Sequence, residues 1–209
     1  MITLDLKKDL KAYYNPSPKK VEIVDVPAFQ FMMIDGSIEP GMGPGTSPGF
    51  QTAMEALYGA SYTLKFMFKQ RKVDPVDYPV MALEGLWWVK DGRFDINIKD
   101  NWFYTVMILQ PDIVTPEVFA EALVQLRKKK GDQPAFGKLR LETFKEGLCV
   151  QTLHIGPYAT EPATVEKMHA FAKENGLTLK QEHHEIYLGN PMRSAPEKLK
   201  TILRLPVVK

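Results

Sequence analysis

Two segments of the chain repeat one order of predicted elements, and this repeat constrains the fold more than any other feature. Each copy has a strand, a turn containing glycine, a helix, and then a strand that carries a glutamate. The corresponding positions are 31–34 and 150–155 for the first strand, Gly36 and Gly156 for the turn, Phe50 and Thr160 for the start of the helix, and Glu84 and Glu185 for the glutamate. Two like units related by a pseudo-twofold axis leave a cleft between them, and such clefts are common ligand sites.

Hydrophobic periodicity places the elements within and around the two copies. Apolar residues recur every three or four positions between Phe50 and Phe68, which is typical of a helix that buries one stripe. Thr115 and Gly131 have the residue types of a helix N-cap and a helix C-terminus, and Thr160 is also expected to cap a helix. The expected strands are 21–26, 29–34, 80–89, 93–98, 102–109, 139–144, 148–155 and 201–207, with turns at 100–101 and 145–147, and 177–188 is either a strand pair or one long strand.

The composition excludes several classes of protein. The chain has 209 residues, of which 44% are hydrophobic and 25% charged, and these values are ordinary for a globular protein. Its formal net charge of +2 is too small to predict attraction to nucleic acid or to a membrane surface. The apolar runs are far shorter than the roughly 20 residues of a membrane helix, and the first residues are too charged for a secretory signal. A single cysteine, Cys149, cannot form an internal disulfide, so we expect a cytoplasmic protein.

Glu185 is the first candidate functional residue, because it lies in the middle of the expected strand HHEIYL. Side-chain alternation places His183, Glu185 and Tyr187 on one face of that strand. A carboxylate within an interior strand is costly to bury unless a ligand or partner needs it there. Glu84 has the matching place in the other copy, and the repeat therefore predicts both glutamates in one cleft. The alternative is that either glutamate points to solvent.

Tryptophan and tyrosine side chains gather near the two glutamates. Trp87 and Trp88 lie on the expected strand of the first glutamate, and Tyr104 lies on a neighbouring strand. Tyr58 and Tyr62 are four residues apart on the first long helix. Core packing explains most aromatic stripes, but the O–H and N–H groups of Tyr and Trp suit the wall of a ligand site. A register slip of one residue would exchange Trp87 with Trp88 at this wall.

Motifs for other chemistries are missing from the sequence. It has no G-x-S-x-G, H-E-x-x-H, C-x-x-C or Walker lysine motif, and the glycine-rich run 41–45 lacks the context of a dinucleotide-binding loop. His183 and His184 are adjacent and therefore lie on opposite faces of a strand, which excludes joint chelation of one metal ion there. The basic run 127–130 ends a helix, which explains it without nucleic acid. We therefore expect neither a metal site nor an organic cofactor.

Several short motifs keep one order along nearly the whole chain. The first set is LHIGPY at 153–158, HEIYLGNP at 184–191 and LPV at 205–207. The second set is FQ-x-A at 50–53, LY at 57–58, YTLKF at 62–66 and LEGLWW at 83–88. Together these motifs resemble the GyrI-like small-molecule-binding family, and the second set suggests its stand-alone branch.

The resemblance implies an α+β fold of two βαββ-type, SHS2-like units in pseudo-twofold arrangement, with a mainly antiparallel sheet and helices on one side. The repeat then covers about 21–110 and 138–207 of a single domain spanning 1–209, after a short N-terminal extension, 1–20. The central cleft of the family takes aromatic, often cationic, ligands over a buried glutamate, here Glu185. Because the extension is too short for a DNA-binding helix-turn-helix, we expect no transcription factor and no direct nucleic-acid partner.

Within the stand-alone branch, the resemblance implies hydrolases that open the strained cyclopropane ring of genotoxic, planar cyclopropanoid natural products. Glu185 would hold the attacking water as a base, while Tyr187 or Tyr158 would stabilise the charge that grows on the carbonyl oxygen. The predicted site residues are Glu185 and Tyr187 as catalytic, with Glu84, Trp87, Trp88, Tyr58, Tyr62, Tyr104, Tyr158 and His154 as ligand-binding. Two alternatives stay open: the pocket only binds a hydrophobic drug or cation, or the protein inhibits a partner such as DNA gyrase.

Overall fold

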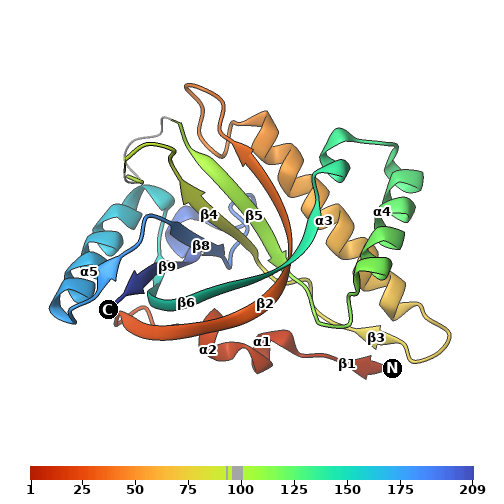
Figure 1. Ribbon diagram of the computed structural model, residues 1–209, viewed down its shortest axis with the longest axis horizontal. Coiled ribbons are helices and arrows are strands. Elements are labelled where there is room, and N and C mark those ends of the chain that lie inside the picture. The colour runs from red at the N-terminus through yellow and green to blue at the C-terminus, as the bar shows by residue number, and fades with distance from the viewer. Residues whose placement is uncertain (93, 96–100) are drawn as a thin grey trace.

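Two units of the same plan form the centre of the structure, and the computed structural model describes residues 1–92, 94–95 and 101–209 (Figure 1). The first unit consists of strand β2 (Glu22–Ser37), helix α3 (Pro48–Lys69) and strands β4 (Leu83–Trp88) and β5 (Phe103–Leu109). The second unit consists of strand β6 (Arg140–Ile155), helix α5 (Glu161–Glu174) and strands β8 (His183–Tyr187) and β9 (Lys200–Val208). The predicted α+β fold of two βαββ-type units is confirmed. The strand predicted over 93–98 and the turn at 100–101 fall mostly outside the described residues.

Strand pairing closes the six long strands into a ring. β5 lies between β2 and β4 in the first unit, and β9 lies between β6 and β8 in the second. The two units meet twice, because β2 pairs with β6 and β4 pairs with β8, in both cases antiparallel. Each strand of the ring therefore has a partner on both edges, which removes the exposed edges of an open sheet. This closed arrangement relates the two units by the expected pseudo-twofold axis.

Helix α3 covers the first unit with one apolar stripe, as the periodicity predicts. The Ser47 hydroxyl accepts a hydrogen bond from the backbone N–H of Phe50 at 3.2 Å. Pro48 occupies the first turn of the helix, where its missing N–H costs nothing. The buried side chains of the helix are Phe50, Ala53, Ala56, Leu57, Ala60, Ser61, Leu64 and Phe68.

Helix α4 (Pro116–Lys130) packs against α3, and both of its predicted ends are confirmed. The side chain of Thr115 accepts a hydrogen bond from a backbone N–H of the first turn, and Gly131 follows the helix with φ at 80°. Thr160 occupies the N-cap position of α5, as predicted, but its side chain does not cap the helix. Its hydroxyl donates to the Pro157 carbonyl at 2.8 Å and makes no capping bond with the helix.

Strands β2 and β6 are each continuous over 16 residues, whereas the sequence predicts each of them in two pieces. The predicted turn at 145–147 is wrong. Gly147 has φ at 78°, yet it keeps Val26 as its ladder partner and stays within β6. Glycine adopts this left-handed conformation without steric cost, so the strand continues through it. Of the two alternatives for 177–188, the strand pair is confirmed as β7 (Thr178–Leu179) and β8.

The first 14 residues fold onto the ring, which the sequence analysis missed. β1 (Ile2–Thr3) pairs with β3 (Val76–Asp77), and the single-turn helices α1 (Leu6–Asp9) and α2 (Lys11–Tyr14) follow β1. Such short helices gain their stability from tertiary contacts, so they leave little periodicity in the sequence. Three 3-10 helices are η1 (Pro134–Gly137), η2 (Tyr158–Thr160) and η3 (Pro196–Lys198). Among the described residues, no helix combines the length and the apolar character needed to cross a membrane.

Helices α3 and α5 belong to different units, and we call the boundary between these units, along β4 and β8, the seam. The larger core includes the buried stripe of α3, and a smaller core lies beneath α5, where Val150, Met168, Ala172, Leu203 and Leu205 pack together. Figure 1 shows α3 and α5 on opposite sides of the ring, with β4 and β8 between them. The seam between the units is therefore the place where a ligand cleft is expected.

Candidate functional site

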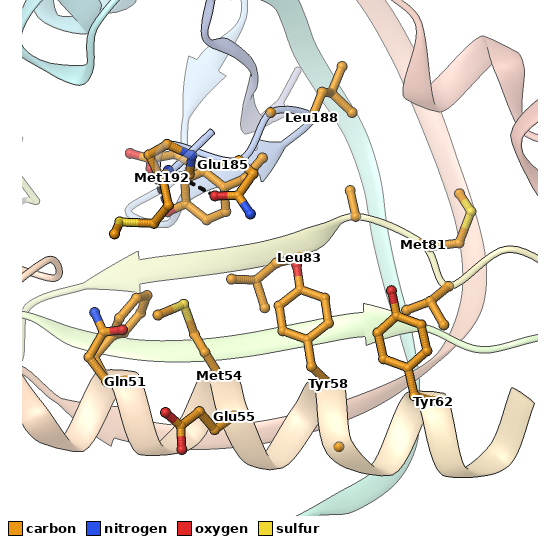
Figure 2. Close-up of a pocket in the computed structure, with 18 of the residues that line it drawn as sticks. Gln51, Met54, Glu55, Tyr58, Tyr62, Met81, Leu83, Glu185, Leu188 and Met192 are labelled. Carbon is orange, nitrogen blue, oxygen red and sulfur yellow. Dashed lines mark hydrogen bonds between the residues drawn. The ribbon is translucent and has the colours of Figure 1, made fainter. Parts of the chain in front are cut away.

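A cavity of about 2900 Å³ lies along this seam. Its lining comes mainly from α3, from β4 and β8, and from the segments that follow β6 and β8, and residues of the N-terminal segment 5–15 and of α4 also border it. Figure 2 shows Tyr58 and Tyr62 of α3 directed toward Leu83 of β4, with Glu185 and Met192 across the cavity. Both units contribute residues, so the predicted central cleft is present.

Strands β4 and β8 place Gly85 and Glu185 opposite each other on the face that lines the cavity. Trp87 Nε1 donates to the hydroxyl of Tyr187 at 3.0 Å, and that hydroxyl donates to Glu185 Oε2 at 2.6 Å. A Cβ atom at position 85 would lie 2.9 Å from Trp87 Nε1 and 3.3 Å from the Tyr187 hydroxyl. Glycine at this position therefore leaves the space that the chain of hydrogen bonds occupies.

His183 completes the surroundings of Glu185. Its Nε2 lies 3.0 Å from Glu185 Oε1, so both carboxylate oxygens have a partner. The shared face predicted for His183, Glu185 and Tyr187 is confirmed. Burial, and next the charge of Glu185, raise the pKa of Tyr187 well above its usual value. Tyr187 therefore keeps its proton and holds the carboxylate in place.

A second carboxyl group at the cavity, Glu161, was missed by the sequence analysis. It is the first residue of α5, is 1% exposed and lines the cavity. Its Oε1 has no hydrogen-bond partner within the described part of the chain. Burial, and next the charge of Glu185, raise the pKa of Glu161 to about 9. The available signal was a glutamate directly after the GPYAT turn, where α5 begins.

Aromatic rings line much of the cavity. Tyr58 and Tyr62 stack with their ring centroids 6.5 Å apart and are 37% and 47% exposed, which suits neighbours at i and i+4 on one helix. Tyr158 meets Tyr187 edge to face, with centroids 6.0 Å apart. The cavity thus brings together six of the predicted site residues: Glu185, Tyr187, Trp87, Tyr58, Tyr62 and Tyr158.

Comparison with known proteins identifies the family. The family model described as GyrI-like small molecule binding domain matches residues 19–208. The chain belongs to this GyrI-like family. The resemblance carried by the short motifs is therefore confirmed, and the cavity is that of a small-molecule-binding GyrI-like domain. Among curated proteins, none matches the chain.

Three solved structures from Listeria innocua are similar to this GyrI-like domain along almost its entire length. An uncharacterized conserved protein is 41% identical, with a TM-score of 0.87, and the match covers 98% of this chain and 100% of that one. Two hydrolases are 40% and 38% identical, with TM-scores of 0.84 and 0.82. Those matches cover 99% and 98% of this chain and 100% of each hydrolase.

Glu84 lies on the opposite face of the sheet from Glu185, which corrects its expected place in the cleft. It pairs with Ile186, and alternation turns it to the face opposite the cavity, where α2 contacts it. Its Oε1 accepts a hydrogen bond from the Tyr14 hydroxyl at 2.6 Å, and its Oε2 lies 3.0 Å from His184 Nε2. Glu84 is therefore a fully buried partner of other protein groups.

Three further predicted ligand-binding residues of the GyrI-like domain lie outside the cavity lining. Trp88 lies on the face of the sheet opposite the cavity and stacks on an aromatic ring of β5, with centroids 6.3 Å apart. Tyr104 is 2% exposed and meets Phe50 of α3 edge to face at 5.0 Å. His154 Nδ1 lies 2.9 Å from the Thr164 hydroxyl and ties β6 to α5. These three side chains pack or bridge elements and do not face the cavity.

The face opposite the cavity holds a second group of buried ionisable side chains, which we call the inner cluster: Tyr14, Glu84, Glu146, His184 and Arg204. His184 Nδ1 lies 2.9 Å from Glu146 Oε1, and Arg204 Nη1 donates to Glu146 Oε2 at 3.0 Å. Burial would lower the pKa of His184, but Glu146 and Glu84 outweigh it and raise the pKa to about 9. Burial would raise the pKa of Glu146, but His184 and Arg204 lower it to about 2. In the part of the chain that the structure describes, no group of three His, Cys, Asp or Glu side chains is placed to hold a metal ion.

Proposed function

We propose that this GyrI-like domain hydrolyses planar aromatic electrophiles that carry a strained cyclopropane ring conjugated to a dienone. The observation that carries the proposal is Glu185, a carboxylate held by Tyr187 and His183 in an aromatic-lined cavity. Two similar Listeria proteins are hydrolases, which supports a hydrolytic reaction at this cavity. The proposal assigns the electrophile to the cavity and the attacking water to Glu185.

The reaction needs little activation, because opening the cyclopropane relieves ring strain and produces an aromatic ring. A water molecule held by Glu185 attacks the ring methylene, and Glu185 takes a proton from that water as a general base. The strained C–C bond breaks, and its electron pair moves through the dienone to the carbonyl oxygen. Tyr187 acts as a positioning residue, since its own proton is already donated to Glu185.

The aromatic lining suits a flat ring system. Tyr58 and Tyr62 present partly exposed rings from α3, and Trp87 and Tyr158 face the cavity from the two units. Each favourable aromatic contact contributes about 0.5–1.5 kcal/mol beyond the burial of area. Affinity therefore comes from stacking, while the carboxylate supplies the chemistry.

A second function uses the same cavity without turnover. The partners of Glu185 are His183 and Tyr187, and none of the ion pairs among the described residues joins it to lysine or arginine. A hydrophobic cation would find a carboxylate and aromatic faces together, and these are the two elements of cation recognition. In that case the cavity sequesters its ligand.

Turnover separates the two functions. Purified protein is mixed with a spirocyclopropyl cyclohexadienone that bears a fused aryl ring, and mass spectrometry follows the ring-opened phenol, which is heavier by one water. Glu185→Gln should lower kcat by about 10²–10⁴-fold, because the amide cannot accept the proton. Glu182→Gln, an exposed neighbour, is the matched control and should leave kcat unchanged. Stoichiometric binding without product would overturn the hydrolase, and an unimpaired Glu185→Gln variant would overturn the role of Glu185.

A further inference from the structure

Ring opening in the proposed reaction raises the question of which group protonates the product oxygen. The electron pair that reaches the carbonyl oxygen forms a phenolate, which must be stabilised or protonated. The Tyr187 hydroxyl cannot serve without releasing Glu185, because its proton lies on the 2.6 Å bond to that carboxylate. Tyr158, the other hydroxyl expected near this oxygen, has its pKa raised to about 12 by burial, so it is a weaker acid than a phenol product. The site therefore needs another acid.

Glu161 has the geometry of such an acid. Its side chain is 99% removed from solvent, yet it lines the cavity, and its Oε1 has no partner within the described residues. A buried carboxyl oxygen without a hydrogen bond is costly, and a catalytic role is one of the reasons for which such a group is retained. Pro162 follows it in the first turn of α5 and restricts the backbone there.

We propose that Glu161 is the proton donor of the site and protonates the oxygen of the bound electrophile while Glu185 deprotonates the attacking water. This inference rests on the proposed hydrolytic function and completes it. The two carboxyl groups then have opposite roles, one entering the reaction as an acid and the other as a base.

The surroundings of Glu161 favour its protonated form in the free protein. The ionisable groups that interact with it are Glu185 and Tyr187 of β8 and Tyr158 of η2, while the nearby Thr201 hydroxyl of β9 opposes the rise in its pKa. Among the described residues, no ion pair joins Glu161 to a cation. Burial and the nearby carboxylate raise its pKa to about 9, so it holds a proton at neutral pH. After donation, the positive end of the α5 dipole stabilises the anion.

The atoms and electrons of this step balance. A C–O bond forms between water and the ring methylene, and one cyclopropane C–C bond breaks. Glu185 gains the proton that the water loses, and the oxygen of the product gains the proton of Glu161. Solvent protons then return both groups to their starting states, and no oxidant or reductant takes part.

Glu161→Gln tests the donor, because the amide keeps the size and neutrality of the acid but has no proton to transfer. With the spirocyclopropyl cyclohexadienone, kcat should fall by about 10²–10⁴-fold while KM changes little. Wild-type kcat should decrease as pH rises toward about 9, since ionised Glu161 cannot donate, and this decrease should disappear in the variant. Glu161→Asp, which retains an acid, should recover part of kcat together with the alkaline decrease.

Glu166→Gln is the matched control, because Glu166 lies exposed on the same helix. A Glu161→Gln variant with wild-type kcat, or with the alkaline decrease intact, would overturn the donor while leaving the hydrolase standing. Absence of turnover by the wild-type protein overturns both. Infrared difference spectra give an independent readout: the C=O band of a protonated carboxylic acid should be present at neutral pH in the wild-type protein and missing in Glu161→Gln. Without that band the proposal is wrong whatever the kinetics.

Discussion

Two clusters of buried ionisable side chains lie back to back on β4 and β8. The inner cluster joins His184 and Arg204 to two carboxylates, and each of its charges has a partner of opposite sign. The cavity cluster, Glu161, His183, Glu185 and Tyr187, has two carboxyl groups near each other and a carboxyl oxygen without a partner. His184 and Glu185 are adjacent in the chain, yet alternation assigns them to different clusters.

A structural cluster and a functional cluster differ in how completely their charges and hydrogen bonds are paired. A fully satisfied buried network holds the surrounding elements in one arrangement, and here Arg204 also donates to the backbone of α2 at Tyr13. A network that holds a protonated carboxyl group beside a carboxylate and leaves a hydrogen bond unmet costs stability, and such networks are concentrated at functional sites. Burial alone does not distinguish the two, because Glu84 and Glu161 are both almost fully buried.

The largest expected effect is on the inner cluster. Arg204→Met leaves Glu146 and Gln151 without their donor, and breaking a buried ion pair costs about 3–5 kcal/mol in the free energy of unfolding. Urea unfolding measures this cost. Arg140→Met is the control, because its pairs with Asp35 and Glu142 are partly exposed and should contribute less than about 1 kcal/mol.

Glu185→Gln tests the same difference between the two clusters, because it changes a residue of the cavity cluster. It should leave the free energy of unfolding within about 1 kcal/mol of the wild-type value, because the glutamine oxygen can still accept the hydrogen bond of Tyr187 and the neighbouring Glu161 holds a proton at neutral pH. A loss as large as that of Arg204→Met would show that the cavity cluster also holds the fold together, and the distinction between the clusters would then fail.

The pH dependence of stability is the next effect in size. The pKa of Glu161 is raised from 4.5 to about 9 and that of His184 from 6.5 to about 9, so folding retains their protons and the free energy of unfolding decreases as pH rises. Between pH 4.5 and 6.5 the decrease in the free energy of unfolding comes from Glu161. Below pH 4.5 the lowered pKa of Glu146 reverses the sign, because protonation of that carboxylate favours unfolding.

Glu161→Gln should therefore be more stable than the wild-type protein at pH 7, by an amount on the order of 1–3 kcal/mol. Its stability should also be flat between pH 4.5 and 6.5. Urea titrations at fixed pH values test this, and an unchanged slope in the variant would show that Glu161 ionises normally in the folded protein.

The sequence predicted the repeat, the cleft and the face shared by His183, Glu185 and Tyr187, but it misplaced Glu84. β4 begins at Leu83 and β8 at His183, and the counterpart of Glu185 across the axis is Gly85. Aligning the two units so that Glu84 matches Glu185 shifts one strand by one residue relative to the other. A shift of one residue along a strand moves each side chain to the other face of the sheet.

Other contacts could not be found from local patterns. The Tyr14 hydroxyl meets Glu84 across 70 positions of sequence, and Arg204 meets the backbone of Tyr13 across 191. The closed ring of strands brings such residues together, and local periodicity in the sequence does not indicate that they meet. Glu161 was overlooked for a related reason, since a polar residue at a helix start is usually explained by the helix itself.

The smallest predicted effect concerns Trp87 and Trp88, which are adjacent on β4 and therefore lie on opposite faces of the sheet. Trp87→Phe removes the N–H that donates to Tyr187 at 3.0 Å, and loss of one such hydrogen bond, about 1 kcal/mol, should lower kcat by about 5-fold. Trp88→Phe changes a ring on the other face and should leave kcat within about twofold of the wild-type value. Rates are compared at equal concentrations of folded protein, because both substitutions also remove packing. If Trp88→Phe lowered kcat as much as Trp87→Phe, the chemistry would be sensitive to both faces of β4, and the separation of a structural from a functional cluster across one strand would not hold.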